Sequence, residues 1–398
     1  MSGDKEQLYN ERLKRYVAAM RNEKPDRIPI RPLAAEFCAT YAGYTCQQVT
    51  HDLDYAFDAV LKCCADFDWD AAVSNMVFVW TGSVDAINLK YYTKPGIDTP
   101  ADSCFQYLEP KDDDAHMKED EYDALIEDPT GYLANVWMPR VSRDVQPIGE
   151  PSTYRNNMAW LKGGMSVLQY FQRLGEQDAR MKKETGTVSA IAGCLKSPFD
   201  IIADKLRGYR GLCMDLFTQP EKVLKAVEAL TPHMAFNALA GADPNKNVPI
   251  TIWMHRGCVP FLSLEQFERF YWPSLKEIVE EIWSQGHQIL FYAEGDWNEN
   301  LKYFAELPEQ SIIFHVDKSD VLKAHEILGE KFCLSGGIPN ELIAMGTPEE
   351  VKDYCKKVID IAAQDGGYIM DASAIMQDDA KIENVKAMTE FTREYGVY

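Results

Sequence analysis

Short apolar runs alternate with longer amphipathic stretches along most of this chain, and this alternation limits the folds that it can adopt. The apolar runs predict eight strands, at 27–31, 69–73, 187–191, 249–253, 287–291, 311–315, 332–336 and 368–372. Helices are expected between most of them, with capping boxes at Thr218 with Glu221, Ser263 with Gln266, and Thr347 with Glu350. Strands that alternate with helices form parallel sheets, and eight such units are typical of a closed barrel. The sequence therefore predicts an α/β fold, a (β/α)₈ TIM barrel.

One long segment, 75–186, does not follow the alternation. It holds a hairpin-like stretch at 88–96, an acidic run from Glu109 to Asp128, and several aromatic residues. We interpret it as an insertion after the second strand that forms a lid over the barrel mouth, in a chain that is otherwise one barrel domain over 1–398. The acidic run is either a solvated surface or a docking face for a protein partner. The aromatic residues expected to wall a pocket are Trp80, Tyr91, Phe105 and Trp137.

The charge and the cysteines exclude several classes of function. A formal net charge of −21 argues against nucleic acid or an anionic membrane as partner, because both bind basic surfaces. No apolar run approaches the length of a membrane span, and the N-terminus lacks a secretory pattern. The ten cysteines form no CxxC pair. We expect a cytoplasmic protein with reduced thiols.

In barrels of this kind the functional site is built from the C-terminal ends of the strands. Three polar residues stand out there, because His255, Glu294 and His315 each follow an apolar run and need a partner to offset desolvation. The full set of strand-end candidates is Arg31, Ser74, Asn75, Cys194, His255, Tyr292, Glu294, His315, Asp317, Ser335 and Asp371.

Zinc is one partner that these three residues could share. Imidazole and carboxylate groups suit zinc, and a catalytic zinc takes three protein ligands with a fourth position open. The sequence predicts Glu294, His315 and His255 as ligands, although Asp371 could replace His255. Asp371 or Asp317 could also act as general base or accept a hydrogen bond from a ligating imidazole. The alternative is a hydrogen-bonded polar layer without a metal ion.

The chain also resembles a known family over nearly its whole length. The resemblance lies in the segments ERLKRYVAAMRNEKPDRIPI (11–30), FDWDAAVSN (67–75), KSPFDIIADKLRG (196–208), FLSLEQFERFYWPSLKEIVEEI (261–282) and ENVKAM (383–388). These segments are similar to elements of the uroporphyrinogen decarboxylase superfamily, which includes the methylcobamide methyltransferases. The resemblance implies the same barrel fold.

The motifs of the two main branches of this family are altered here. Porphyrinogen decarboxylases carry RQAGR after the first strand, whereas this chain reads RPLAAEFCATYAG and offers Arg31 alone. Thiol methyltransferases carry an HxCG zinc motif where this chain reads FYAEGD, so that Tyr292 and Glu294 replace the histidine and the cysteine. No cysteine occurs in IMDASAI (369–375), where their last ligand would lie. The resemblance therefore implies a site without thiolate ligands.

Glu294 and His315 resemble the Glu-x20-His half of a zinc pattern in ether-cleaving O-demethylase methyltransferases. The earlier glutamate of that pattern falls on Val279. The resemblance implies that a methyl group moves from a methoxylated, aromatic substrate to a Co(I) corrinoid. Because the chain has no corrinoid-binding DxHxxG motif, the corrinoid is expected on a partner protein.

The residues expected at this site have different roles. Glu294, His315 and Asp371 are the predicted catalytic residues, and the substrate is expected to contact Arg31, Trp253, Phe291, Tyr292 and Trp297. One alternative is a decarboxylase of a tetrapyrrole or a smaller aromatic acid, with Arg31 binding a carboxylate and Asp70 or Asp371 stabilising a developing cation. Another is a barrel that binds a ligand or a corrinoid protein without turnover.

Overall fold

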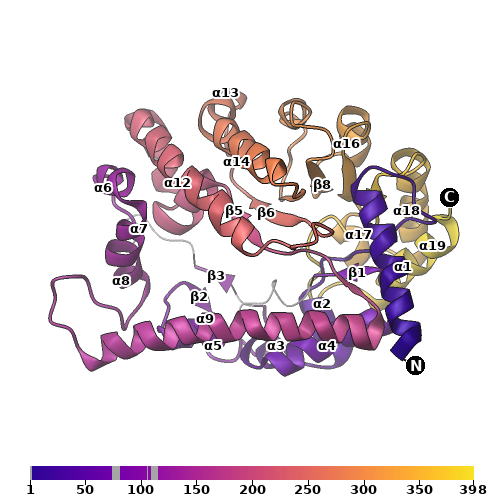
Figure 1. Ribbon diagram of the computed structural model, residues 1–398, viewed down its shortest axis with the longest axis horizontal. Coiled ribbons are helices and arrows are strands. Elements are labelled where there is room, and N and C mark those ends of the chain that lie inside the picture. The colour runs from indigo at the N-terminus through magenta and orange to yellow at the C-terminus, as the bar shows by residue number, and fades with distance from the viewer. Residues whose placement is uncertain (1, 74–80, 105, 109–114) are drawn as a thin grey trace.

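The computed structural model describes residues 2–73, 81–104, 106–108 and 115–398 (Figure 1). The strands are β1 (Ala71–Ala72), β2 (Tyr92–Thr93), β3 (Gln106–Tyr107), β4 (Val188–Ser189), β5 (Cys194–Lys196), β6 (Ile250–Met254), β7 (Ile289–Ala293), β8 (Ile312–Val316), β9 (Cys333–Gly336) and β10 (Tyr368–Ile369).

The α-helices are α1 (Ser2–Met20), α2 (Glu36–Ala42), α3 (Cys46–His51), α4 (Leu53–Asp66), α5 (Thr81–Ala86), α6 (Tyr122–Glu127), α7 (Pro129–Tyr132), α8 (Met138–Val141), α9 (Tyr154–Arg180), α10 (Pro198–Ile201), α11 (Tyr209–Thr218), α12 (Pro220–Ala240), α13 (Leu264–Gln266), α14 (Trp272–Ser284), α15 (Leu301–Phe304), α16 (Val321–Leu328), α17 (Asn340–Met345), α18 (Pro348–Ala362) and α19 (Ile382–Tyr395). Short π-helical turns are η3 (Leu133–Trp137), η4 (Met181–Thr185), η5 (Ile202–Leu206) and η6 (Phe267–Tyr271).

The main sheet is parallel and has the strand order β10-β9-β8-β7-β6-β5, and β1 pairs in parallel with β4. Backbone hydrogen bonds join these two sheets at both ends. Ile30 forms a parallel bridge with Met370, and its carbonyl accepts from the amides of Asp70 and Ala71. On the other side, β4 and β5 belong to one stretch of chain, and the amide of Ala192 donates to Pro249. The predicted parallel α/β class is therefore confirmed.

Most of the predicted strands lie within two residues of their expected positions, but the third one extends further. Pairing with β6 continues through β5 to Lys196, beyond a turn at Gly193, where φ is +87°. Cys194 therefore begins β5, and the prediction that it ends the strand is wrong. Lys196 ends the strand instead. A glycine permits this positive φ without the clash that a Cβ atom would cause.

Two of the three predicted capping boxes are confirmed. Ser263 and Thr347 each accept from a backbone amide of the following turn, and the glutamine or glutamate three residues later bonds back. The prediction for Thr218 is wrong, because this residue is the last in α11 and its hydroxyl donates to the carbonyl of Met214. Helix α12 begins at Pro220 without a side-chain cap.

Amphipathic helices lie outside the parallel strands. Figure 1 shows α12, α14, α16, α18 and α19 around them, and α12 packs on α14, α16 on α18, and α18 on α19. Their apolar faces and the strands form one continuous core. Among the described residues, none of the helices has the length and apolar character that a bilayer span requires.

The segment 75–186 contains elements of a different kind. Strands β2 and β3 form an antiparallel pair, and α9 follows as a long helix along one edge of the molecule (Figure 1). Part of the predicted hairpin is present, since β2 lies within 88–96, but its partner strand lies further along the chain. Ser74, Asn75, Trp80 and Phe105 lie outside the described residues. The lid therefore stays a prediction.

Asp70 is a buried carboxylate that joins three segments of the fold. Its Oδ1 lies 2.5 Å from Nη1 of Arg15 and 3.5 Å from Nη2 of Arg27, and its Oδ2 accepts from the amide of Ile30 at 2.9 Å. These bonds connect α1 and residues 27–31, a predicted strand that forms only isolated bridges at Arg27 and Ile30, to β1. Because Asp70 precedes β1, it lies at the opposite end from the strand ends where the site is expected. This position removes Asp70 from the decarboxylase alternative.

We predict that Asp70→Asn lowers the free energy of unfolding by about 3–5 kcal/mol, because it removes the buried anion that Arg15 and Arg27 share and leaves Arg15 with Asp26 alone. Urea denaturation followed by circular dichroism measures the change. Asp123→Asn is the control, since its ion pair with Lys222 is exposed and is worth about 1 kcal/mol or less. A loss at Asp70 as small as that of the control would contradict this role.

Candidate functional site

Five side chains occupy the same level of neighbouring parallel strands. Lys196, Trp253, Tyr292, His315 and Ser335 are consecutive partners in register from β5 to β9. Ring centroids are 4.5 Å apart for Trp253 and Tyr292, and 4.9 Å apart for Tyr292 and His315, whose planes are 13° from parallel. Ser335 Oγ lies 3.0 Å from Nδ1 of His315. The strand register therefore produces one continuous layer of polar and aromatic groups.

The inner part of this layer is fully buried. Arg31 donates to Oγ of Ser335 at 2.9 Å, and its Nη2 lies 3.5 Å from Oδ2 of Asp371 and 3.4 Å from Nδ1 of His315. Burial raises the pKa of Asp371 to about 7, although Arg31 opposes this shift. Burial, and then Arg31, hold the pKa of His315 well below its usual value. His315 is therefore a neutral imidazole.

Both ring nitrogens of His315 have partners. Nε2 lies 3.1 Å from the carbonyl oxygen of Ser373, which can only accept, so Nε2 carries the hydrogen. Nδ1 then accepts from Arg31 or Ser335. In this arrangement His315 has no lone pair left for a metal ion.

A second cluster lies at the strand ends and is partly accessible. Nε2 of His255 lies 3.4 Å from Oε2 of Glu294, and Nδ1 lies 3.4 Å from both Oδ2 of Asp204 and Nζ of Lys196. Asp204 also accepts from Lys196 at 2.5 Å and from Nε of Arg256 at 2.9 Å. Burial and then Lys196 lower the pKa of His255 to about 3. The imidazole is neutral at pH 7.

Glu294 faces this imidazole from the end of β7. Burial raises the pKa of its carboxyl to about 7, and the nearby carboxylates, led by Asp317, add to this shift while Lys196 opposes it. Its backbone is fixed by bonds from its amide to Met254 and from the indole of Trp297 to its carbonyl. The carboxyl thus changes protonation state near neutral pH.

Asp317 caps the neighbouring loop. Its Oδ2 accepts from the amide of Gly295 at 2.8 Å, which ties the end of β8 to the residue after Glu294. This contact gives Asp317 a positioning role at the strand ends.

The predicted ligands fall into two groups. His255 contacts Glu294, whereas His315 contacts Arg31 and Asp371, and no contact joins His315 to the other pair within the described part of the chain. Tyr292 lies between the groups. Among the residues that the structure describes, no set of three or more His, Cys, Asp or Glu side chains is arranged to hold a metal ion.

Two of the predicted substrate contacts need correction. Phe291 lies on the opposite face of β7 from Tyr292 and packs against Phe304 of α15, with ring centroids 5.4 Å apart. Trp297 is fully buried and packs against Tyr271. Because successive strand residues point to opposite faces, Phe291 belongs to the layer between strands and helices. Trp253 remains at the site.

The sequence analysis missed Lys196, Asp200 and Asp204. Asp200 is buried and accepts from the amide of Arg256 at 2.7 Å and from the hydroxyl of Tyr271 at 2.7 Å, which fixes the loop after β6. Burial alone would raise the pKa of Asp204, but Lys196 and His255 hold it below its usual value. The available signal was the pair of aspartates four residues apart in an apolar helix, a spacing that places them on one face.

The segment 75–186 contacts the helical turn that carries Asp204. The hydroxyl of Tyr91 donates to the carbonyl of Asp204 at 3.2 Å, and the indole of Trp137 donates to that of Lys205 at 2.7 Å. Nζ of Lys205 lies 3.9 Å from the centre of the Tyr91 ring, and burial lowers the pKa of this lysine to about 7. Tyr91 and Trp137 therefore lie next to the cluster of His255, Glu294, Asp204 and Lys196, called the rim cluster below.

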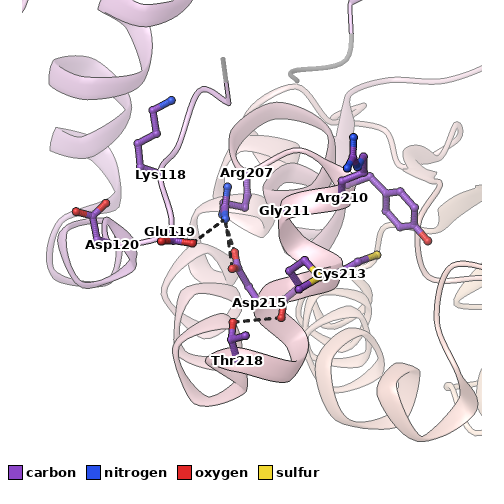
Figure 2. Close-up of a pocket in the computed structure, with 11 residues that line it drawn as sticks. Lys118, Glu119, Asp120, Arg207, Arg210, Gly211, Cys213, Asp215 and Thr218 are labelled. Atoms are coloured by element: carbon purple, nitrogen blue, oxygen red, sulfur yellow. Dashed lines mark hydrogen bonds and ion pairs between the residues drawn. The ribbon is translucent and has the colours of Figure 1, made fainter. Parts of the chain in front are cut away.

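A separate hollow of about 890 Å³ lies beside α11 (Figure 2). Arg207 at its wall is bonded to Asp215 at 2.6 Å and lies 3.8 Å from Glu119. None of the predicted site residues lines this hollow. Its size alone does not connect it with the strand ends.

Comparison with known proteins adds a family and a fold. Residues 164–395, more than half of the chain, match the family model of uroporphyrinogen decarboxylase (URO-D). The fold is similar to that of a methyltransferase from Methanosarcina mazei, with a TM-score of 0.64, 14% identity and coverage of 96% of this chain and 98% of that one. A B12-independent methionine synthase from Shewanella sp. W3-18-1, in complex with selenomethionine, gives a TM-score of only 0.33 at 10% identity, covering 93% and 98% of the two chains. No curated protein matches the chain.

We predict that Glu294→Gln changes how stability depends on pH. The carboxyl has a pKa raised from 4.5 to about 7, so its stabilising contribution is complete below pH 4.5 and is lost as the pH rises through 7. The variant should therefore gain about 1 kcal/mol relative to wild type between about pH 5 and pH 8, a modest gain because solvent reaches the side chain.

Urea denaturation of both proteins at the two pH values checks this prediction. Glu349→Gln serves as the control, because the side chain of Glu349 is 79% exposed. If the difference between wild type and Glu294→Gln were the same at both pH values, the raised pKa would be refuted.

Proposed function

Because the chain belongs to the uroporphyrinogen decarboxylase family, we propose that it is an enzyme of the methyltransferase branch. It would move a methyl group from a methoxylated aromatic substrate to the Co(I) corrinoid of a partner protein. The main observation in favour of this proposal is that the lysine and arginine side chains at the site are paired with aspartates. Lys196 and Arg256 are bonded to Asp204, and Arg31 lies against Asp371. A neutral ether suits such a site better than a tetrapyrrole with several carboxylates, which needs unpaired cations.

Trp253, the partly exposed member of this pair, would contact the aromatic ring of the substrate, and Tyr292, which is 1% exposed, would pack behind it. Their rings meet at 58° and lie beside the rim pair of His255 and Glu294. Aromatic surfaces of this kind bind a flat ring by stacking and edge contacts. His315 and Asp371 would support Tyr292 from below and keep its ring fixed.

Glu294 would act on the oxygen that leaves as a phenolate. A carboxyl with a pKa of about 7 can hold a proton at Oε2 and donate it to this oxygen near neutral pH. The methyl group itself would pass to Co(I), a strong nucleophile, so the chain needs no covalent intermediate. Asp204 and Lys196 would keep His255 in place.

We propose zinc as an alternative means of stabilising the same oxygen, in which Glu294 would ligate the metal as a carboxylate and would not donate a proton. Nε2 of His255 is buried without a hydrogen-bond partner and faces Glu294, and Nδ1 can donate to Asp204, as in many zinc-bound histidines. These two residues could supply two of the three protein ligands of a catalytic zinc ion, which would polarise the ether oxygen as a Lewis acid when bound. His315, the predicted third ligand, would have to leave its bonds with Ser373 and Ser335.

The proposal also includes a corrinoid protein as partner and the segment 75–186 as a lid. The corrinoid would arrive on a separate protein and approach the strand ends, where Glu294 is accessible. The segment 75–186 would cover the substrate, and its contacts from Tyr91 and Trp137 to η5 are consistent with that position.

We predict that the protein converts a phenyl methyl ether to a phenol while methyl-Co(III) forms. The assay combines a panel of methoxyarenes with a Co(I) corrinoid protein and follows absorbance and phenol release. Glu294→Ala should lower kcat about 10²- to 10⁴-fold, the usual range for loss of acid catalysis, whereas Glu349→Ala should not. Absence of phenol and methylcobamide across the panel, with decarboxylation of a porphyrinogen, would support the decarboxylase alternative instead.

We also predict about one zinc ion per chain in protein purified without chelators, as expected for a single catalytic site. Glu294→Ala and His255→Ala should each lower the zinc content measured by elemental analysis. His287→Ala is the control, because His287 precedes β7 at the opposite end of the strands. His315→Ala tests the third ligand. Wild-type protein free of metal would refute the zinc proposal while leaving methyl transfer testable in the assay above.

A further inference from the structure

Helix α9 runs along one edge of the molecule (Figure 1), and one of its faces exposes apolar side chains to solvent. The side of the helix that carries Ala159, Ser166 and Leu174 is buried. The opposite side carries six large apolar residues that are 45–73% exposed, namely Trp160, Leu161, Met165, Val167, Leu168 and Phe171. Positions 161, 165 and 168 form one row along the helix, and positions 160, 167 and 171 form a second row beside it, because residues three, four or seven apart lie on the same side of a helix. A contiguous patch of this kind marks an interaction surface.

The charge distribution limits what can cover this face. The chain has a formal net charge of −21 and 26% charged residues, yet Lys162 is the one charged residue between Asn156 and Gln172. Two copies of the chain repel each other over most of their surfaces. The face of α9 has almost no charged side chains, so it adds little to the repulsion between two copies. A negatively charged surface, such as an anionic membrane, would repel the acidic remainder of the molecule.

Gly164 lies near the middle of the face, and packing against its own chain does not require a glycine there. A Cβ atom at this position would meet nothing within 4 Å, whereas one at Gly163 would lie 2.7 Å from Cγ2 of Ile87. Glycine inside a helix is destabilising relative to alanine, so a reason for it is expected. Outward-facing glycine lets the backbone of a second helix approach closely.

The exposed apolar surface also favours pairing of two copies. Each of the six residues is about half exposed or more, so pairing this face with itself would remove a contiguous apolar surface from water on both copies. A face that pairs with itself forms an isologous contact about a twofold axis.

We propose that α9 is the dimer interface of this protein. The α9 helices of two copies pack antiparallel through the face of Trp160 to Phe171, and they cross near Gly164. The inference is independent of the chemistry proposed for the rim cluster.

The experiment measures the mass of the full chain by light scattering over a series of micromolar concentrations. Wild type should have twice the monomer mass of 45.2 kDa. Leu168→Glu should weaken the dimer at least about tenfold, because it places a charge in an apolar contact. The control is Met345→Glu on α17, which is 79% exposed in wild type and lies outside the face. This control should remain a dimer.

The variant Gly164→Ala tests whether Gly164 serves the contact between two copies or the stability of its own helix. It should leave the thermal stability of the diluted monomer unchanged or higher, since alanine favours the helix, and it should weaken the dimer. A wild type that is monomeric at every concentration, or a dimer that neither variant weakens, would overturn the proposal. So would flotation of a monomeric wild type with vesicles of phosphatidylcholine and phosphatidylglycerol that Leu168→Glu abolishes, because that result would assign the face to a membrane surface.

Discussion

The register of five parallel strands is the constraint on which the site depends. It places Lys196, Trp253, Tyr292, His315 and Ser335 at one level from β5 to β9, and a shift of one residue in any strand would turn its side chain towards the helices. The loops after β6 and β7 then carry His255 and Glu294 above this layer. The positions of His255 and Glu294 thus depend on the backbone pairing of the strands below them.

Burial explains why the two clusters carry so little free charge. Isolated charges are costly in a low-dielectric interior, so buried groups either pair or become neutral. Asp204 pairs with Lys196 and Arg256, whereas His255 and His315 lose their protons, and the pKa of Glu294 rises to about 7. The result is a site with hydrogen-bonding capacity and aromatic surface but little net charge. Such a site is suited to a neutral substrate whose leaving group becomes anionic.

Local sequence patterns were sufficient to predict the parallel α/β class and the residues at most strand ends. Glu294 and His255 were identified because a polar residue after an apolar run is unusual. Their partners were not, since Lys196, Asp200 and Asp204 meet them only through tertiary packing across β5 and β6. The sequence also placed Phe291 and Trp297 at the site, because an apolar run does not reveal which face of a strand is inward, or whether an aromatic residue in the loop after it is buried. His315 was grouped with Glu294 by spacing, but its bonds to Ser335 and Ser373 hold it in the inner cluster.

The central claim is that the site binds a neutral aromatic ether in preference to a polycarboxylate, because its lysine and arginine side chains are already paired with aspartates. Isothermal titration of the protein with a methoxyarene and, separately, with a carboxylated tetrapyrrole tests this claim directly, since binding is measured without turnover. We expect the methoxyarene to bind more tightly, and we expect Trp253→Ala to weaken its binding. Tighter binding of the tetrapyrrole, accompanied by loss of that binding in Arg31→Ala, would contradict the account.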